Sequence, residues 1–215
     1  MSARYPVMVD LAGRPCLVVG GGAVATRKVL GLLAVDALVT VRAPELSAPL
    51  AELATAGRIR WEEGPYAALG VADDGRSWSL VFAATDDAAV NLAVVSDSDA
   101  AGAWANDASD PTGGPAALPA SWHEGPVTLA VSTDGVHPGA ARWLCDQAAL
   151  AVTPEALEAL ALIDEIRLED VAAGGLGRRP DWRSAVESGT LDLIREGHLA
   201  AAKERLQACL SSSSD

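Results

Sequence analysis

Short apolar runs alternate with longer segments of helical periodicity along the first half of the chain. The run CLVVGGG, residues 16–22, is rich in β-branched side chains and ends at three glycines. The next segment, 23–35, places Val24, Leu30 and Leu33 on one helical face. An alternating pattern predicts a short strand from Tyr5 as well. Further strands are predicted at 37–41, 58–61, 78–85 and 103–106. Helices are predicted between them over 45–57, broken early by Pro49, and over 86–102. This alternation predicts a parallel sheet with right-handed crossovers.

The second half has a different pattern. One more strand is predicted at 125–133, and Pro138 then begins a helix. From Thr153, a predicted N-cap followed by Pro154, the chain is expected to be helical to its end, with a Gly/Pro/Arg linker at 174–181. We therefore expect three regions with the bounds 1–110, 111–150 and 151–215.

Composition and charge narrow the class of protein. The 215 residues carry a net charge of −13, which argues against nucleic acid and anionic membranes as partners. The three cysteines are far apart and form no CxxC pair, so neither a disulfide framework nor a zinc site is expected. No signal peptide or apolar run of membrane-spanning length is evident. We expect a cytoplasmic protein.

The three glycines suggest a binding site. Gly20, Gly21 and Gly22 stand between a predicted strand and a predicted helix. A dinucleotide pyrophosphate requires a close backbone approach and the free N–H groups of a helix N-terminus. Ala25 stands where the usual GxGxxG fingerprint has its third glycine. A plain turn would also use these glycines, but their place after a β-branched strand favours dinucleotide binding.

The cofactor choice stays open at this stage. An acidic residue commonly ends the second strand of an NAD site, whereas here Arg42 stands at that strand end. Arg42 either meets the 2′-phosphate of NADP or is an ordinary exposed arginine.

Several motifs together resemble the siroheme-synthase N-terminal family. They are GGGAVATRK (20–28), VRAPELS (41–47), VFAATDDAAVN (81–91) and PVTLAVSTDG (126–135), in order along the chain. The resemblance implies a Rossmann-like NAD-binding domain, a central dimerisation region and a helical C-terminal module in a homodimer. It implies precorrin-2 dehydrogenase activity, and in many members sirohydrochlorin ferrochelatase activity. NAD contacts are implied at Gly20, Gly21, Gly22, Ala23, Val24, Pro44 and Glu45, and Thr85 is expected beside them.

The segment WANDASDPTGGPAALPA, residues 104–120, departs from the family pattern N-x-x-D-D-P. Asn106, Asp110 and Pro111 match, but Ser109 replaces the first Asp, which the resemblance implies acts in both dehydrogenation and chelation. A second departure is STDGVHP, where His137 replaces a serine. We expect Asn106, Ser132 and His137 to contact the tetrapyrrole, or Asn106 to orient the loop.

Ser109 is a poor base without a partner, so a neighbouring carboxylate is needed. Asp107 or Asp110 is the candidate, with Asp110 preferred because it aligns with a family Asp. Both residues are alternatively turn-forming Asx residues. The lone histidines carry no ligand-like spacing, and no resident metal is expected.

Three functions remain open. The first is an NAD-dependent precorrin-2 dehydrogenase with doubtful ferrochelatase activity. The second is a tetrapyrrole chelatase or carrier without dehydrogenase activity, and the third is a non-catalytic NAD-binding regulatory module.

Overall fold

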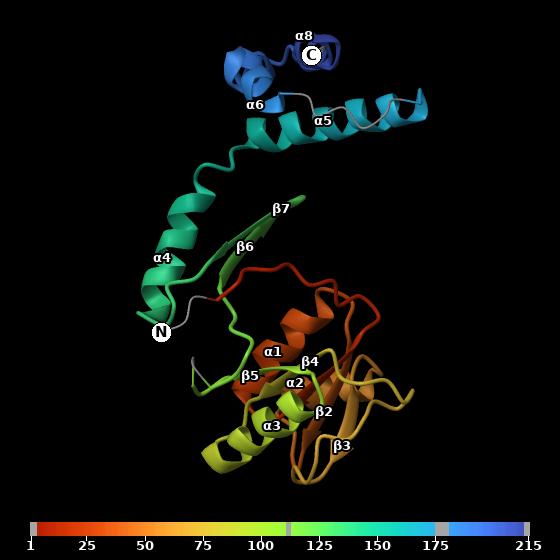
Figure 1. Ribbon diagram of the computed structural model, residues 1–215, viewed down its shortest axis with the longest axis vertical. Helices are drawn as coiled ribbons and strands as arrows, with labels where there is room; N and C mark the ends of the chain where they lie inside the picture. Colours follow the sequence, from red (N-terminus) through yellow and green to blue (C-terminus); the bar gives the residue numbers. More distant parts are fainter. Residues whose placement is uncertain (1–3, 111–112, 175–180, 213–215) are drawn as a thin grey trace. The chain divides into compact units, whose positions relative to one another are not determined.

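The structure is a computed structural model that describes residues 4–110, 113–174 and 181–212 (Figure 1). It divides into two compact units, which are described separately. The first comprises Met1–Leu118 and Asp134–Val136, and the second comprises Pro119–Thr133 and His137–Asp215. The expected linker lies almost wholly outside the described residues.

A five-stranded parallel sheet forms the centre of the first unit and confirms the predicted fold class (Figure 1). Its strand order is β3-β2-β1-β4-β5. Order reverses between β1 and β4, and open α/β sheets bind ligands at the carboxyl ends of the strands at such a point. The elements are β1 (Pro15–Val19), α1 (Ala23–Leu33), β2 (Leu38–Ala43), α2 (Ala48–Thr55), β3 (Arg60–Glu63), β4 (Leu80–Ala83), α3 (Ala88–Ala100) and β5 (Trp104–Asp107).

Strand β1 is buried along its whole length because both faces of the sheet are covered. Cys16 and Val18 belong to one core cluster with residues of α1, such as Val29. Leu17 and Val19 alternate with them and belong to a second cluster, which includes residues of α3. The sheet therefore holds the ends of β1 and β4 rigidly in place.

Two local predictions were wrong. Residues 4–10 form no strand, and Tyr5 and Met8 expose most of their side chains. Because no neighbouring strand of the first unit pairs with this segment, alternation alone does not make it a strand. Pro49 does not break a helix but lies in the first turn of α2, where a missing N–H has no cost.

The second unit starts with an antiparallel hairpin of β6 (Ala120–Glu124) and β7 (Val127–Val131), turning at Gly125 with φ +52°. Only β7 was predicted; residues 121–124 of β6 lie between the 104–120 loop and the predicted strand at 125–133 and were assigned to no element. Helix α4 (Pro138–Ala149) begins at Pro138 as predicted and packs on both strands.

The remaining helices enclose a small core of their own. Thr153 caps α5 as predicted, its hydroxyl accepting from the N–H of Ala156 at 3.3 Å. The core consists of Leu162, Ile166, Ala185, Ala202 and Leu206. Among the described residues, no helix has the length and apolar character needed to cross a membrane. The elements are α5 (Pro154–Ala172), α6 (Trp182–Ala185), the π-helical turn η1 (Val186–Thr190), α7 (Leu191–Arg195) and α8 (Leu199–Ser212).

Candidate functional site

The glycine loop connects β1 to α1, and its three glycines are not equivalent. Gly20 has φ +126°, and a Cβ there would collide with the carbonyl of Ala84, just beyond β4. A Cβ on Gly21 would collide with the carbonyl of Glu45. A Cβ on Gly22 would meet nothing within 4 Å. Packing therefore requires the first two glycines, whereas the third leaves space in front of the helix.

The N-terminus of α1 is suited to an anion. Its N-cap, Gly22, makes no side-chain cap, and no acidic residue lies in the first turn. In α3, by contrast, Asp87 caps the helix by accepting from the N–H groups of Ala89 and Val90 at 2.8 and 3.3 Å. Uncapped N–H groups and the partial positive charge of the helix favour a phosphate at Gly22, Ala23 and Val24. The predicted pyrophosphate fits these residues.

The loop after β2 is fixed against the glycine loop. The N–H of Gly20 donates to the carbonyl of Arg42 at 3.0 Å, and the N–H of Ser47 donates to Gly21 at 2.8 Å. Pro44 and Glu45, between these anchors, are exposed at the carboxyl edge of the sheet. Glu45 is thus an acidic side chain near the end of β2.

Arg42 is not the ordinary exposed arginine that one of its two predicted alternatives describes. Its side chain is only 14% exposed, and its guanidinium is held by Glu62 at 2.7 Å and by the carbonyl of Ala68 at 2.5 Å. It also lies 5.9 Å from the ring centroid of Tyr66. Burial, and then a hydrogen bond to Asp97, raise the pKa of Tyr66 above its ordinary value. Arg42 is therefore engaged within the fold and is not an ordinary exposed arginine.

Thr85, just beyond β4, is bonded to a buried side chain of α3. Asn91 Oδ1 accepts from the Thr85 N–H at 3.1 Å and from the Thr85 hydroxyl at 2.7 Å. Asn91 Nδ2 donates to the Thr85 carbonyl at 3.1 Å and to Ser109 Oγ at 3.3 Å. This amide links the end of β4 to the loop after β5. Sequence reasoning missed it, although Asn91 shares a helical face with buried Val94 and Ser98.

The loop after β5 is organised by Asp107. Strand pairing places Asp107 beside Ala83, so its position is that of the carboxyl edge. The buried Asp107 accepts at Oδ1 from the Ser109 hydroxyl at 2.6 Å and from the Ser109 N–H at 2.8 Å. The N–H of Asp110 donates to the same oxygen at 3.3 Å. Asp107 thus forms an Asx turn and also binds the hydroxyl at the position of the family's first Asp.

Asn106 and the glycines hold the rest of this loop. Asn106 Nδ2 donates to the Ala116 carbonyl at 3.0 Å, so its observed contact is with the loop. A Cβ on Gly113 would lie 3.0 Å from the Cβ atoms of both Asp107 and Asp110, which explains the small residue there. Asp110 is exposed, and Pro111 lies outside the described residues.

The other predicted contacts lie in the second unit. Ser132 directly follows β7. His137 is the N-cap of α4, and its Nδ1 accepts from the N–H of Gly139 at 3.0 Å. Within the described part of the chain, no group of three or more His, Cys, Asp and Glu side chains is placed to hold a metal ion.

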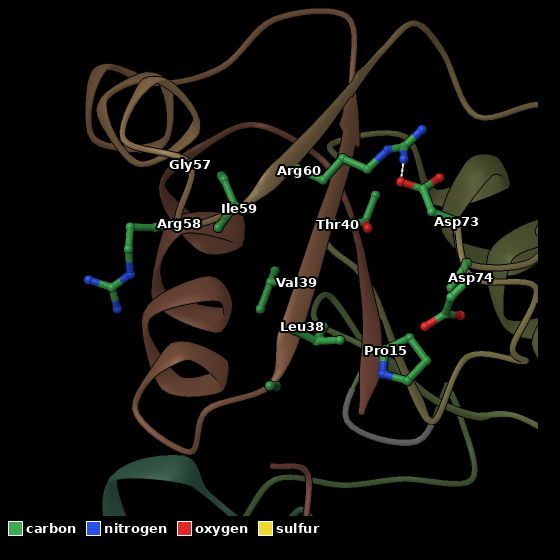
Figure 2. A pocket seen from close by; sticks show the side chains of 12 residues that line it. Pro15, Leu38, Val39, Thr40, Gly57, Arg58, Ile59, Arg60, Asp73 and Asp74 are labelled. Carbon is green, nitrogen blue, oxygen red and sulfur yellow. Dashed lines mark ion pairs between the residues drawn. The ribbon is translucent and has the colours of Figure 1, made fainter. Parts of the chain in front are cut away.

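A cavity of about 330 Å³ lies at the opposite edge of the sheet (Figure 2). It is lined by Pro15, Leu38 and Arg60, the first residues of β1, β2 and β3. Figure 2 shows Arg60 paired with Asp73 across it. Because parallel strands share one carboxyl edge, this amino-edge cavity is separate from the glycine loop.

Comparisons with known proteins agree with this arrangement. The family model described as "Putative NAD(P)-binding" matches residues 7–120. A siroheme synthase from Gluconacetobacter diazotrophicus is 35% identical over 210 residues, covering 96% of this chain and 44% of that protein. A siroheme synthase from Chromobacterium violaceum is 35% identical over 211 residues, covering 94% and 43%. The chain therefore spans less than half the length of these relatives.

A solved structure named "SirC, precorrin-2 dehydrogenase" is also similar. It superposes with a TM-score of 0.70 and 29% sequence identity, covering 96% of this chain and 99% of that one. The similarity therefore covers residues of both units.

Proposed function

The chain belongs to the NAD(P)-binding family, and from this membership we propose that it is an NAD-dependent precorrin-2 dehydrogenase of siroheme biosynthesis. Its relatives are named siroheme synthases, and the similar structure is named a precorrin-2 dehydrogenase. One observation carries the proposal further than the names. An uncapped glycine loop and a hydroxyl–carboxylate pair both follow strands at the carboxyl edge, on either side of the point where strand order reverses.

The chain's residues would divide the work of binding. The N–H groups at Gly22, Ala23 and Val24 would hold the pyrophosphate, and Glu45 would accept from a ribose hydroxyl. Thr85 would contact the cofactor near the nicotinamide. Bound NAD supplies the acceptor for the hydride that the substrate loses.

The Ser109–Asp107 pair would accept the accompanying proton. Ser109 Oγ takes a proton from the substrate while its own proton passes along the 2.6 Å hydrogen bond to Asp107 Oδ1. The substrate would thus lose a proton to this pair as it loses the hydride, and would gain a double bond. After product release the proton returns through Ser109 to water. This assignment favours Asp107 over Asp110, because Asp107 Oδ1 accepts directly from the exposed Ser109 hydroxyl at 2.6 Å.

NAD, rather than NADP, is proposed as the cofactor. The guanidinium of Arg42 is committed to Glu62 and to backbone carbonyls, and the exposed residue that follows β2 is the acidic Glu45. A carboxylate repels a 2′-phosphate but accepts from a 2′-hydroxyl.

A homodimer is also proposed. A two-stranded hairpin is marginal alone, and the strands β6 and β7 contain no fully buried residue. Trp143 on α4 is 60% exposed, and Leu150, the C-cap of that helix, is 73% exposed. A second copy related by two-fold symmetry would cover these surfaces. The Trp143→Glu variant should be a monomer by light scattering. The control is Leu92→Glu, which changes an exposed leucine of the first unit and should leave the dimer intact. A monomeric wild-type protein would refute the dimer.

The function is tested by mixing the protein with precorrin-2 and NAD and recording NADH absorbance. Turnover in the wild type, lowered by about a hundredfold but still measurable in Ser109→Ala, is the expected result. Absence of turnover with retained insertion of Fe²⁺ into sirohydrochlorin would instead identify a chelatase. NAD binding with neither reaction would identify a regulatory module.

A further inference from the structure

Asn91 is a buried polar side chain that the proposed mechanism does not yet use. It is 1% exposed, on a face of α3 that otherwise packs on the sheet. A buried amide is tolerated only when its hydrogen-bonding groups are satisfied. Asn91 meets this condition entirely through two residues, Thr85 and Ser109.

The contacts to Thr85 fix which way the amide faces. The Thr85 N–H can only donate, so it must face Oδ1, which it does at 3.1 Å. The Thr85 carbonyl can only accept, so it must face Nδ2, also at 3.1 Å. A flipped amide would place oxygen against oxygen and N–H against N–H. The remaining N–H of Nδ2 is therefore directed to Ser109 Oγ at 3.3 Å.

The amide orientation in turn sets the direction of the Ser109 hydroxyl. Because Ser109 Oγ accepts from Asn91, its single hydrogen is left to donate to Asp107 Oδ1 at 2.6 Å. One lone pair of Oγ remains for a substrate proton. A hydroxyl arranged in this way can pass a proton toward Asp107 without first rotating.

We propose that Asn91 is a positioning residue that couples the cofactor-side turn at Thr85 to the proton-accepting hydroxyl of Ser109. The proposal rests on the function proposed above. Asn91 is too deeply buried to touch the substrate, and it acts only through these two neighbours. Its amide fixes the proton-accepting hydroxyl relative to the turn expected to lie against the cofactor.

The test is a double-mutant cycle with Asn91→Asp and Ser109→Ala. The new carboxylate keeps an acceptor for the Thr85 N–H and hydroxyl, but it can donate neither to the Thr85 carbonyl nor to Ser109 Oγ. It also draws the hydroxyl hydrogen of Ser109 away from Asp107. We expect kcat to fall by roughly thirtyfold, with KM and NADH affinity changed by less than about threefold. In the Ser109→Ala background the same change should lower kcat by less than about threefold, because the pathway is already removed.

The matched control is Ser98→Ala, which removes another buried polar group from α3. Ser98 Oγ donates to the Val94 carbonyl at 2.6 Å and is not part of the site, so kcat should not change. Circular dichroism checks folding of every variant. If Asn91→Asp does not fold, Asn91→Ala completes the same cycle, and failure of both variants to fold would make the role structural and overturn the proposal.

The outcomes separate the two proposals. A wild-type protein without turnover refutes the proposed function and the Asn91 proposal with it. If the wild type turns over, an equal loss of kcat in both backgrounds assigns Asn91 to general stability and refutes only the Asn91 proposal. If NADH affinity and kcat fall together, Asn91 acts only on the turn at Thr85 that faces the cofactor. That result also refutes the proposed coupling between Thr85 and Ser109.

Discussion

The glycine loop and the loop after β5 lie at the same edge of one sheet but achieve their structures differently. In the glycine loop the important feature is the absence of side chains, because Gly20 and Gly21 lie against the carbonyls of Ala84 and Glu45. In the second loop the important feature is side-chain hydrogen bonding, centred on Asp107 Oδ1. The first loop is therefore sensitive to volume and the second to the exchange of donors and acceptors.

Gly21→Val should give the largest effect on folding. The added side chain meets backbone at Glu45, which cannot rotate away, so the free energy of unfolding should fall by about 3 kcal/mol. Urea unfolding measures this change. Unchanged stability would show that the β2–α2 connection yields, and that the glycine loop is less constrained by volume than its contacts indicate.

Asp107→Asn tests the second loop at nearly constant volume. Its amide keeps one acceptor oxygen but cannot take a proton, so kcat should fall by about a hundredfold. The matched change Asp110→Asn, in the same loop, should lower kcat by less than about threefold. Steady-state NADH production gives both values, and the reverse ranking would restore the preference for Asp110 that the family alignment suggested.

Gly22→Ser separates binding from folding within the glycine loop. The site has open space and an extended backbone, with φ −88°, and serine is a good N-cap, so stability should not fall. The hydroxyl would occupy the N–H groups offered to the pyrophosphate, and NAD affinity should weaken by roughly tenfold, or ~1.4 kcal/mol. Calorimetric titration measures it, and unchanged affinity would argue against a phosphate at this helix end.

Arg42→Gln should have the smallest effect on cofactor choice. Since the guanidinium is engaged by Glu62 and Ala68, the ratio of NAD to NADP affinity should change by less than about threefold. A large loss of NADP affinity alone would mean that Arg42 leaves its partners to bind the 2′-phosphate.

The same contrast explains which parts of the structure could be predicted from sequence. The parallel sheet, the starts of α4 and α5, and the family resemblance were confirmed, because each depends on local pattern. The sequence also indicated that a glycine is needed at Gly20, on the ground that a ligand must approach the backbone there. The structure gives another reason, because the carbonyl of Ala84, just beyond β4, leaves no room for a Cβ.

What could not be predicted depends on contacts between distant segments. The sequence left two alternatives open for Arg42, because Glu62 and Ala68 reach its side chain only in the folded sheet. The sequence offered two carboxylates, Asp107 and Asp110, as the partner of Ser109. Their positions along the chain did not show that Asp107 accepts from the Ser109 hydroxyl. Asn91 appeared to be an ordinary helical residue, although an amide on an apolar face was an available signal.

The close approach of Gly20 to Ala84 also bears on how the sheet aligns during folding. A strand buried on both faces, such as β1, has no alternation of polar and apolar residues to specify its register. A slip by one residue would exchange one apolar set for another at little hydrophobic cost. A slip in the direction that brings Val19 to the place of Gly20 would, however, put a valine Cβ against the Ala84 carbonyl, where it does not fit. The glycine that opens the binding loop therefore also acts as a register mark for β1 against β4, so selection for correct strand alignment would preserve it even in a descendant that no longer bound a nucleotide.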